Sequence, residues 1–95
     1  MKKFFVNPLG IIFCPEIDQK NNFQTIVLNP LNEKIIKVNP FGYEILKIID
    51  ETPGIYLQNV IQLVSQKRNE MVWQNEKKIG EFINQMIEEN VIFEK

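Results

Sequence analysis

Residues 33–50, EKIIKVNPFGYEILKIID, join a strand pattern directly to a helix pattern, with no loop between the two. Pro40 disfavours helical geometry at the residue before it, so we expect no helix to extend upstream of Asn39. The Asn39 side chain can accept a hydrogen bond from the amide of Phe41 or Gly42, while Pro40 lacks only an amide that would be unpaired at a helix start. A strand is therefore expected to end, and a helix to begin, within a few residues of Asn39.

The segment before this joint has the composition of a small β-sheet. Residues 11–17 favour a strand, but Pro15 cannot donate to a sheet ladder, which indicates a short and irregular strand. Residues 23–28 and 34–38 favour a second and a third strand. Polar residues typical of turns separate the strands at 18–22 and 29–32. The sequence thus predicts a three-stranded antiparallel β-meander at the start of the fold.

In the third strand the side chains alternate between the two faces of the predicted sheet. Ile36 and Val38 share one face, and Ile35 and Lys37 share the other. Both faces are therefore partly apolar, which leaves two interpretations of Ile35. It is either a good strand former whose face has no further role, or an exposed residue that serves binding.

The residues after the joint have the periodicity of three helices, which cover residues 40–51, 56–67 and 75–89. We expect Asn75 to cap the third helix and Asn90 to end it. Apolar residues recur on one face of each helix, at the spacing of a core-facing stripe. These are Phe41, Ile45, Ile48 and Ile49, then Leu57, Val60, Ile61 and Val64, then Ile79, Phe82, Ile83, Met86 and Ile87. Trp73, in the connection before the third helix, is expected to pack against another part of the chain.

Composition limits the chemistry of the chain, which we predict to form a single domain over residues 1–95. The 11 basic and 12 acidic residues give a net charge of −1, without the basic surplus of nucleic-acid-binding proteins. Histidine is absent, Cys14 is the only cysteine, and Ser65, the only serine, has no base partner in the pattern. We therefore predict a protein that is not an enzyme, with no catalytic residues, no metal and no cofactor.

The N-terminal residues resemble a signal peptide at first sight, because Lys2 and Lys3 precede an apolar run. Asn7, Pro8 and Gly10 interrupt that run, so we reject this interpretation. No stretch reaches the length of roughly 20 apolar residues that spans a bilayer. We expect a cytoplasmic protein without a membrane partner.

Three strands followed by three helices are the parts of a winged helix-turn-helix-like α+β fold, which is the architecture that we predict. In a DNA-binding member the recognition helix approaches phosphate groups. The third helix and its flank carry Glu76, Glu81, Glu88 and Glu89 against Lys77 and Lys78. Repulsion from phosphates disfavours a DNA-binding transcriptional regulator, and we expect no nucleic-acid partner. The edge of the third strand suggests a different use, since an extended peptide can add to it as a further strand.

The order and spacing of several short motifs resemble those of the PqqD-like domains, which are RiPP recognition elements. The motifs are the triplet Val38-Asn39-Pro40, then Ile45-Leu46 and Asp50 in the next helix, and Phe82, Met86, Asn90 and Val91 at the end. The resemblance covers residues 11–93. Two positions depart from the family pattern, because Glu51 and Asn90 stand where the family often has Gly.

This resemblance implies a winged-helix-like, non-catalytic protein that binds the leader segment of a ribosomally synthesised precursor peptide. In the family the leader lies along the third strand, in the cleft between that strand and the third helix. The corresponding peptide-binding residues are Lys34, Ile35, Ile36, Lys37, Val38, Lys78, Glu81, Phe82 and Gln85. The implied partners are the precursor and a peptide-modifying enzyme, such as a radical SAM maturase or another RiPP enzyme. An adaptor that docks this enzyme without holding the peptide remains an alternative.

Overall fold

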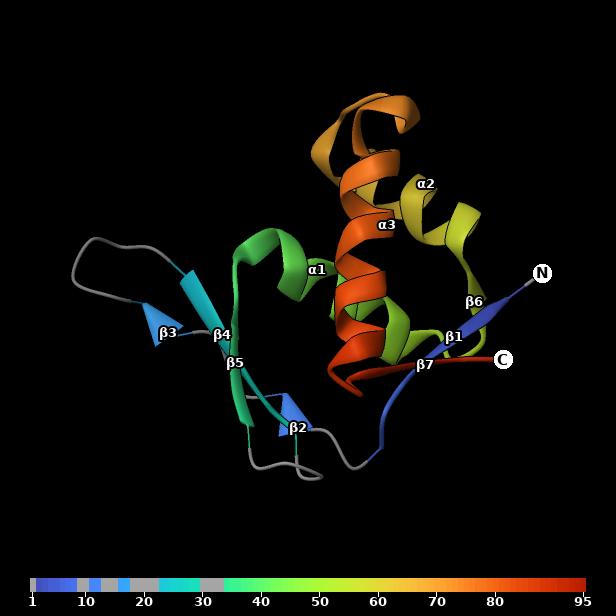
Figure 1. The fold of residues 1–95 in the computed structure, drawn as a ribbon. Coiled ribbons are helices and arrows are strands. Elements are labelled where there is room, and N and C mark those ends of the chain that lie inside the picture. Colours follow the sequence, from blue (N-terminus) through green and yellow to red (C-terminus); the bar gives the residue numbers. More distant parts are fainter. Residues whose placement is uncertain (1, 9–10, 13–15, 18–22, 30–33) are drawn as a thin grey trace.

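The computed structural model describes residues 2–8, 11–12, 16–17, 23–29 and 34–95 (Figure 1). The elements are β1 (Lys3–Val6), β2 (Ile11–Ile12), β3 (Glu16–Ile17), β4 (Phe23–Asn29), β5 (Lys34–Val38), α1 (Pro40–Glu51), β6 (Ile55–Tyr56), α2 (Leu57–Arg68), α3 (Val72–Glu88) and β7 (Ile92–Glu94). The predicted turn at 18–22 and most of the turn at 29–32 lie outside the described residues. Three helices and short antiparallel strands make this an α+β fold.

β1 is the central strand of an antiparallel three-stranded sheet in the order β6-β1-β7. Phe4 lies opposite Ile55 of β6, and Phe5 lies opposite Phe93 of β7. The neighbours of the first strand therefore come from the second half of the chain, and Figure 1 shows the three strands together near both termini. The prediction that a three-stranded meander opens the fold is wrong, because the backbone groups of β1 pair with segments distant in sequence.

β4 has partners along both of its edges. β5 pairs with one edge, from Thr25 opposite Val38 to Asn29 opposite Lys34. β2 and β3 both pair with the other edge, so the strand predicted at 11–17 is two strands of two residues each. Within the described part of the chain, β5 pairs with β4 alone, and its second edge is open.

The joint between β5 and α1 confirms the expected cap. Asn39 has extended geometry, with φ −76° and ψ 173°, and its side-chain oxygen accepts a hydrogen bond from the Gly42 amide at 2.8 Å. Pro40 is the first residue of α1. The strand thus passes into the helix without a loop, which fixes one end of β5 to the helical part of the molecule.

α3 begins three residues earlier than predicted, because Asn75 has a different role from the one expected. Asn75 is buried, and its amide donates to the Ser65 hydroxyl at 3.1 Å, which ties α3 to α2. The first turn of α3 is closed instead by the Gln74 side chain, which accepts from the Met71 amide at 2.8 Å. Asn90, with φ 62°, has the left-handed geometry expected after a helix.

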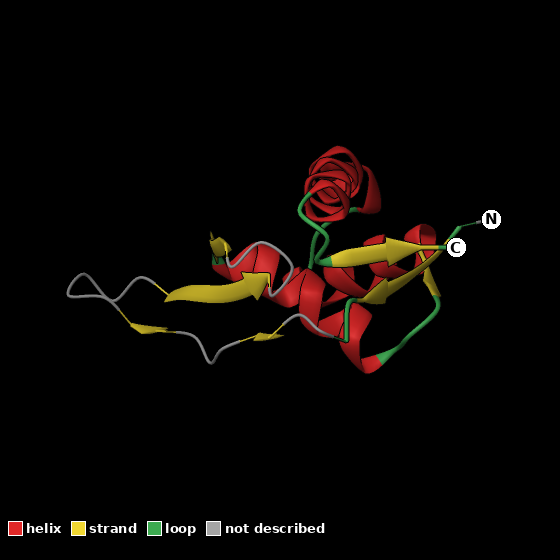
Figure 2. Cartoon of the chain, turned by 60° about the horizontal axis from the view of Figure 1, so that its bottom comes forward, coloured by secondary structure: helices red, strands yellow, loops and turns green. Residues whose placement is uncertain are grey.

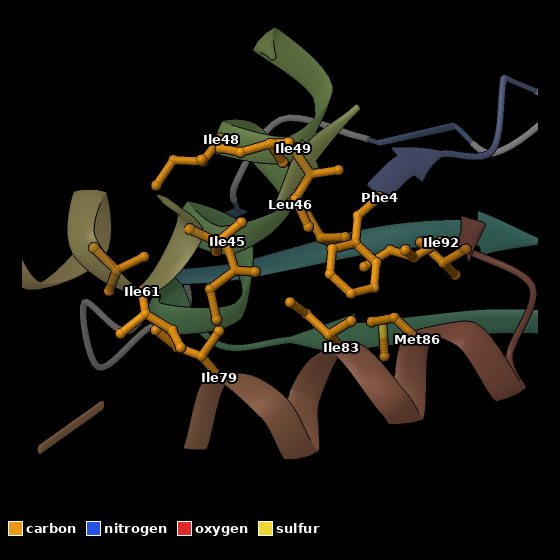
Figure 3. Close-up of a cluster of buried hydrophobic side chains, with 14 of the residues drawn as sticks. Phe4, Ile45, Leu46, Ile48, Ile49, Ile61, Ile79, Ile83, Met86 and Ile92 are labelled. Carbon is orange, nitrogen blue, oxygen red and sulfur yellow. The ribbon is translucent and has the colours of Figure 1, made fainter. Parts of the chain in front are cut away.

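One hydrophobic core lies between the three helices and the three-stranded sheet (Figure 3). Its buried side chains include Phe4, Ile45, Leu46, Ile48, Ile49, Ile61, Ile79, Ile83, Met86 and Ile92. Complete burial of one such side chain stabilises the fold by about 1.5–3 kcal/mol, so this cluster is the main source of stability. Within the described ranges, no helix has the length and hydropathy of a bilayer-spanning segment.

Trp73 does not pack as predicted, since 71% of its surface is exposed. The early start of α3 is the reason. Trp73 belongs to the first helical turn, seven residues before Gly80, and this spacing places it on the side of α3 that faces away from the core. The prediction treated it as part of a connection that folds back onto the chain.

Candidate functional site

β5 combines an anchored face with an open edge. Val38 is only 6% exposed, Ile36 is partly buried, and both pack with the core, whereas Ile35 is 61% exposed and Lys37 is exposed on the other face. The predicted alternation is therefore confirmed. The buried face holds the strand in place, so its unpaired edge has a fixed position.

A groove runs between the open edge of β5 and α3, and we call it the β5–α3 groove. It consists of two adjoining hollows that share Asn39, Phe82 and Gln85. The hollow along the strand has a volume of about 150 Å³ and is also lined by Ile36, Lys37, Val38 and Met86. The larger one has a volume of about 300 Å³ and is also lined by Phe41, Lys78 and Glu81. Residues of β5, apolar rings and charged side chains thus line two adjoining hollows.

Phe82 forms the wall between the groove and the core. It is partly buried and packs against the core cluster, yet it lines both hollows. Its ring lies close to α1, because a Cβ built at Gly42 would come within 2.6 Å of the ring. That Cβ would also lie 3.3 Å from the Cβ of Val38. Gly42 therefore permits α1, β5 and α3 to meet at the floor of the groove.

Arg68 makes several contacts beside Phe41, which lines the larger hollow. Its guanidinium lies 4.9 Å from the centre of the Phe41 ring, a cation–π distance. The same group forms ion pairs with Glu70 at 2.7 Å and with Glu44 at 3.8 Å. These contacts connect α2 with α1 and orient Phe41, which lines the larger hollow. They are partly exposed, so we assign them an orienting role and only a small contribution to stability.

The structure brings most of the predicted peptide-binding residues together. Ile36, Lys37, Val38, Lys78, Glu81, Phe82 and Gln85 all line the groove. Ile35 does not line either hollow, and 61% of its surface is exposed. Lys34 is described only through its backbone, at the start of the strand.

Three lining residues were missed by the sequence analysis: Asn39, Phe41 and Met86. None of the three is predicted as a binding residue: Asn39 is expected to cap the helix, Phe41 and Met86 belong to apolar stripes, and Asn39 and Met86 also belong to the motifs of the resemblance. A usable signal was present for Phe41, since it follows the joint directly and must therefore border the end of β5. Met86 lies one turn after Phe82, but its spacing alone does not distinguish the core from the groove.

The described residues that line the groove include no serine, cysteine or histidine. In the ranges that the structure describes, no cluster of three or more His, Cys, Asp or Glu residues is placed to hold a metal ion. The Ser65 hydroxyl is buried between α2 and α3, where it accepts from Asn75. The polar side chains of the residues that line the two hollows carry two ammonium groups, one carboxylate and two amides.

Comparisons with protein-family models, with curated proteins and with solved structures find no match to this chain. The class of molecule is therefore defined by the fold and the groove themselves. It is a compact α+β domain of three helices, with a small antiparallel three-stranded sheet and, among the described strands, a β5 edge beside α3 that has no partner. The resemblance to PqqD-like domains remains a hypothesis for this chain.

Proposed function

We propose that this protein is a non-catalytic, PqqD-like recognition domain that binds the leader segment of a ribosomally synthesised precursor peptide. The leader adds to β5 as a further strand, within the β5–α3 groove, and is presented to a modifying enzyme. The observation that carries this proposal is the open edge of β5 beside a lined groove. We also propose that the chain has the winged-helix-like topology of that family.

The backbone of β5 supplies the part of this recognition that does not depend on sequence. Neighbouring strands lie about 4.8 Å apart, so an added strand would lie directly outside β5, on the side of the groove. Its N–H and C=O groups would satisfy those at the open edge. Because α1 and the core already fix β5, the edge need not be ordered when the peptide arrives, which favours affinity.

The side chains that line the groove supply the selective part. Phe41 and Phe82 offer apolar ring surface to one inserted side chain, and alternate residues of a bound strand point toward it. Lys78 and Glu81 border the same hollow with opposite charges. We therefore expect a bound segment with one large apolar residue toward the hollow, flanked by charged or polar residues.

The test is a titration of labelled leader peptides, taken from short precursors encoded beside the gene, followed by fluorescence anisotropy. Proline is introduced separately at Ile36 and at Lys37. Amides of adjacent strand residues point to opposite edges, so one substitution removes a donor facing β4 and the other a donor facing the groove. Circular dichroism identifies which variant keeps the fold. Loss of binding in a folded variant supports strand addition, and unchanged binding in both variants contradicts it.

Two further measurements separate this proposal from a DNA-binding regulator and from an adaptor that docks the modifying enzyme. A DNA-binding regulator would bind duplex DNA with an affinity that falls steeply as salt rises, whereas exposed Glu76, Glu81 and Glu88 lead us to expect no such binding. An adaptor would retain the modifying enzyme on an affinity column and fail to bind any leader. Leader binding without DNA binding is the outcome that the proposal requires.

A further inference from the structure

The edge of β5 can offer its backbone to an added strand only as far as Asn39. The carbonyl of Asn39 accepts a hydrogen bond from the Tyr43 amide at 2.9 Å, as the first bond of α1. Pro40, the next residue, has no amide hydrogen. Neither group is left to pair with an added strand, whichever edge it faces. The ladder that a leader forms with β5 therefore ends where α1 begins.

The β5–α3 groove continues past this end of the ladder. Its smaller hollow lies along β5, from Ile36 to Asn39, whereas the larger one is bordered by Phe41 of α1 and by Lys78. β5 and α3 run in opposite directions (Figure 1), and Figure 2 views α3 nearly end-on. Lys78 and Met86 line opposite ends of the groove and are eight residues apart, so the helix between them is about 12 Å long. An extended segment of about four residues has this length, and its part in the larger hollow finds no β5 backbone to pair with.

Gln85 is the side chain that can take the place of the strand edge there. It is exposed and lines both hollows. None of the side-chain hydrogen bonds between described residues involves Gln85. Its amide carries a donor and an acceptor side by side, which is the pair of groups that a strand residue presents to a residue directly opposite. Gln85 can therefore bind the N–H and the C=O of one extended leader residue.

The other polar side chains that line the larger hollow do not offer this pair of groups. Asn39 also lines both hollows, but its side-chain oxygen accepts from the Gly42 amide at 2.8 Å. The ammonium of Lys78 only donates and the ionised carboxylate of Glu81 only accepts, and both residues line the larger hollow alone. Among the described residues at the junction of the hollows, Gln85 alone retains both a donor and an acceptor.

We propose that the Gln85 side chain binds the backbone of the leader directly past the end of the β5 ladder. Its Nε2 donates to the carbonyl of one leader residue, and its Oε1 accepts from the amide of the same residue. This inference rests on the proposed function, because it describes how a leader continues beyond β5. The pair holds the leader at the junction of the two hollows, so that one leader side chain enters the larger hollow, against Phe41 and Phe82, in a single register.

The first experiment measures leader affinity in Gln85 variants by fluorescence anisotropy. The probes are fluorescein-labelled leaders of the short precursors encoded beside the gene. Gln85→Ala should weaken binding about tenfold, the effect of losing two hydrogen bonds of ordinary net strength. Asn84→Ala is the matched control and should bind as the wild type does, since Asn84 is an exposed amide of the same helix that lines neither hollow. Wild-type affinity in the Gln85→Ala variant overturns the inference.

Thermal melting checks that these variants differ from the wild type in binding alone. Both side chains are exposed, so the melting temperatures of Gln85→Ala and Asn84→Ala should differ little from that of the wild type. Loss of affinity in Gln85→Ala together with an unchanged melting temperature supports a direct contact with the leader. An equal loss of affinity in Asn84→Ala would contradict it.

The second experiment distinguishes backbone pairing from recognition of a leader side chain. In a series of leader peptides, one amide of the bound segment at a time is replaced by an ester, which has no N–H. We expect one ester to weaken binding to the wild type and to have no further effect on binding to Gln85→Ala. Esters at positions that pair with β5 should weaken binding to both proteins by the same factor. If no ester is coupled to Gln85→Ala in this way, Gln85 does not bind the leader backbone.

The outcomes separate this inference from the proposed function. Suppose that a leader binds the wild type and loses affinity in a folded proline variant of β5, but binds Gln85→Ala unchanged. Strand addition is then supported, and the inference about Gln85 alone is wrong. If no leader binds the wild type, the proposed function is contradicted, and the inference that rests on it fails as well.

Discussion

β1 and β5 are two short strands that bury similar side chains but differ in the pairing of their backbone edges. Each buries one apolar side chain in the same core, Phe4 in β1 and Val38 in β5, and each of these is 6% exposed. The difference lies in the backbone. β1 has β6 on one edge and β7 on the other, whereas β5, within the described residues, has β4 only. Side-chain burial is therefore similar in the two strands, and only β5 retains backbone groups for a further strand.

The backbones of the two strands therefore differ in their pairing: β1 is paired along both edges, and β5 has the edge at which we propose that a leader adds. The backbone of β1 links the two ends of the chain, since Lys3 and Lys95 exchange hydrogen bonds of 2.8 and 2.9 Å. The backbone of β5 is held by a cap at one end and by its buried face. An open edge is also a risk for aggregation, and the nearby charged residues, such as Lys37 on β5 itself, are a common protection against it.

The largest effect is expected from Phe4→Ala, a substitution in β1, the strand that is paired along both edges. Removing a buried phenylalanine side chain should lower the free energy of unfolding by about 3–5 kcal/mol, because a cavity remains between β1 and the helices. Urea denaturation followed by circular dichroism measures the loss. Phe93→Ala, in neighbouring β7, is the control, since Phe93 is 41% exposed. Equal losses in the two variants would contradict the central position of β1.

Gly42→Ala tests the contact between the open strand and α3. The new methyl group would displace the Phe82 ring toward the groove, with an expected loss of about 1–3 kcal/mol in unfolding free energy and weaker leader binding. The matched control is Gly80→Ala, the same substitution in a helix where no neighbour lies within 4 Å. Denaturation and anisotropy titration give the two readouts. Unchanged leader affinity together with unchanged stability would show that Phe82 does not border the site as described.

Asn39→Ala loosens the anchored end of β5. Loss of the bond to the Gly42 amide should cost about 1 kcal/mol of stability, a typical value for a helix cap. Leader affinity should fall as well, because the edge becomes less ordered before binding. Asn39→Ser keeps a capping oxygen and should restore most of both quantities. If the serine and alanine variants behave alike in denaturation and in titration, the cap does not hold the edge.

The smallest effect is expected from Ile35→Thr, on the exposed face of β5. Threonine keeps the strand preference of isoleucine, and Ile35 is 61% exposed, so stability should change by less than about 0.5 kcal/mol. Leader affinity should also stay within about twofold, because this side chain lies outside the groove. A large fall in affinity would favour the other interpretation of Ile35, as an exposed residue that serves binding.

The sequence predicted best those features that depend on neighbouring residues. The joint at Asn39 and Pro40, the second helix and the left-handed Asn90 are all present as expected. Each depends on local geometry, on capping or on helical periodicity. The alternation along β5 was also correct, because a strand with one buried face requires it.

Features that depend on distant parts of the chain were missed. The sequence analysis assigned no strand to Lys3–Val6, since a short apolar run acquires strand structure here only by pairing with β6 and β7. Asn75 was predicted to cap α3, but its partner Ser65 lies on another helix. The groove also depends on elements that are distant in sequence, since β5, α1 and α3 all contribute to its lining. The resemblance identifies seven of its lining residues but not Asn39, Phe41 and Met86, although the place of Phe41 directly after the joint was a usable signal. The leader peptide and the modifying enzyme remain predictions.

The pairing of Lys3 with Lys95 has a practical consequence for tethering. Both ends of the chain emerge together, on the side of the molecule opposite β5 in Figure 1, and the longest dimension of the molecule is 35 Å. A flexible linker spans about 35 Å on average when it has roughly 40 residues. A leader fused to either end through a linker of that length would reach β5 at a high effective concentration. A much shorter linker would hold the same leader away from β5, so such fusions would measure the distance between terminus and groove.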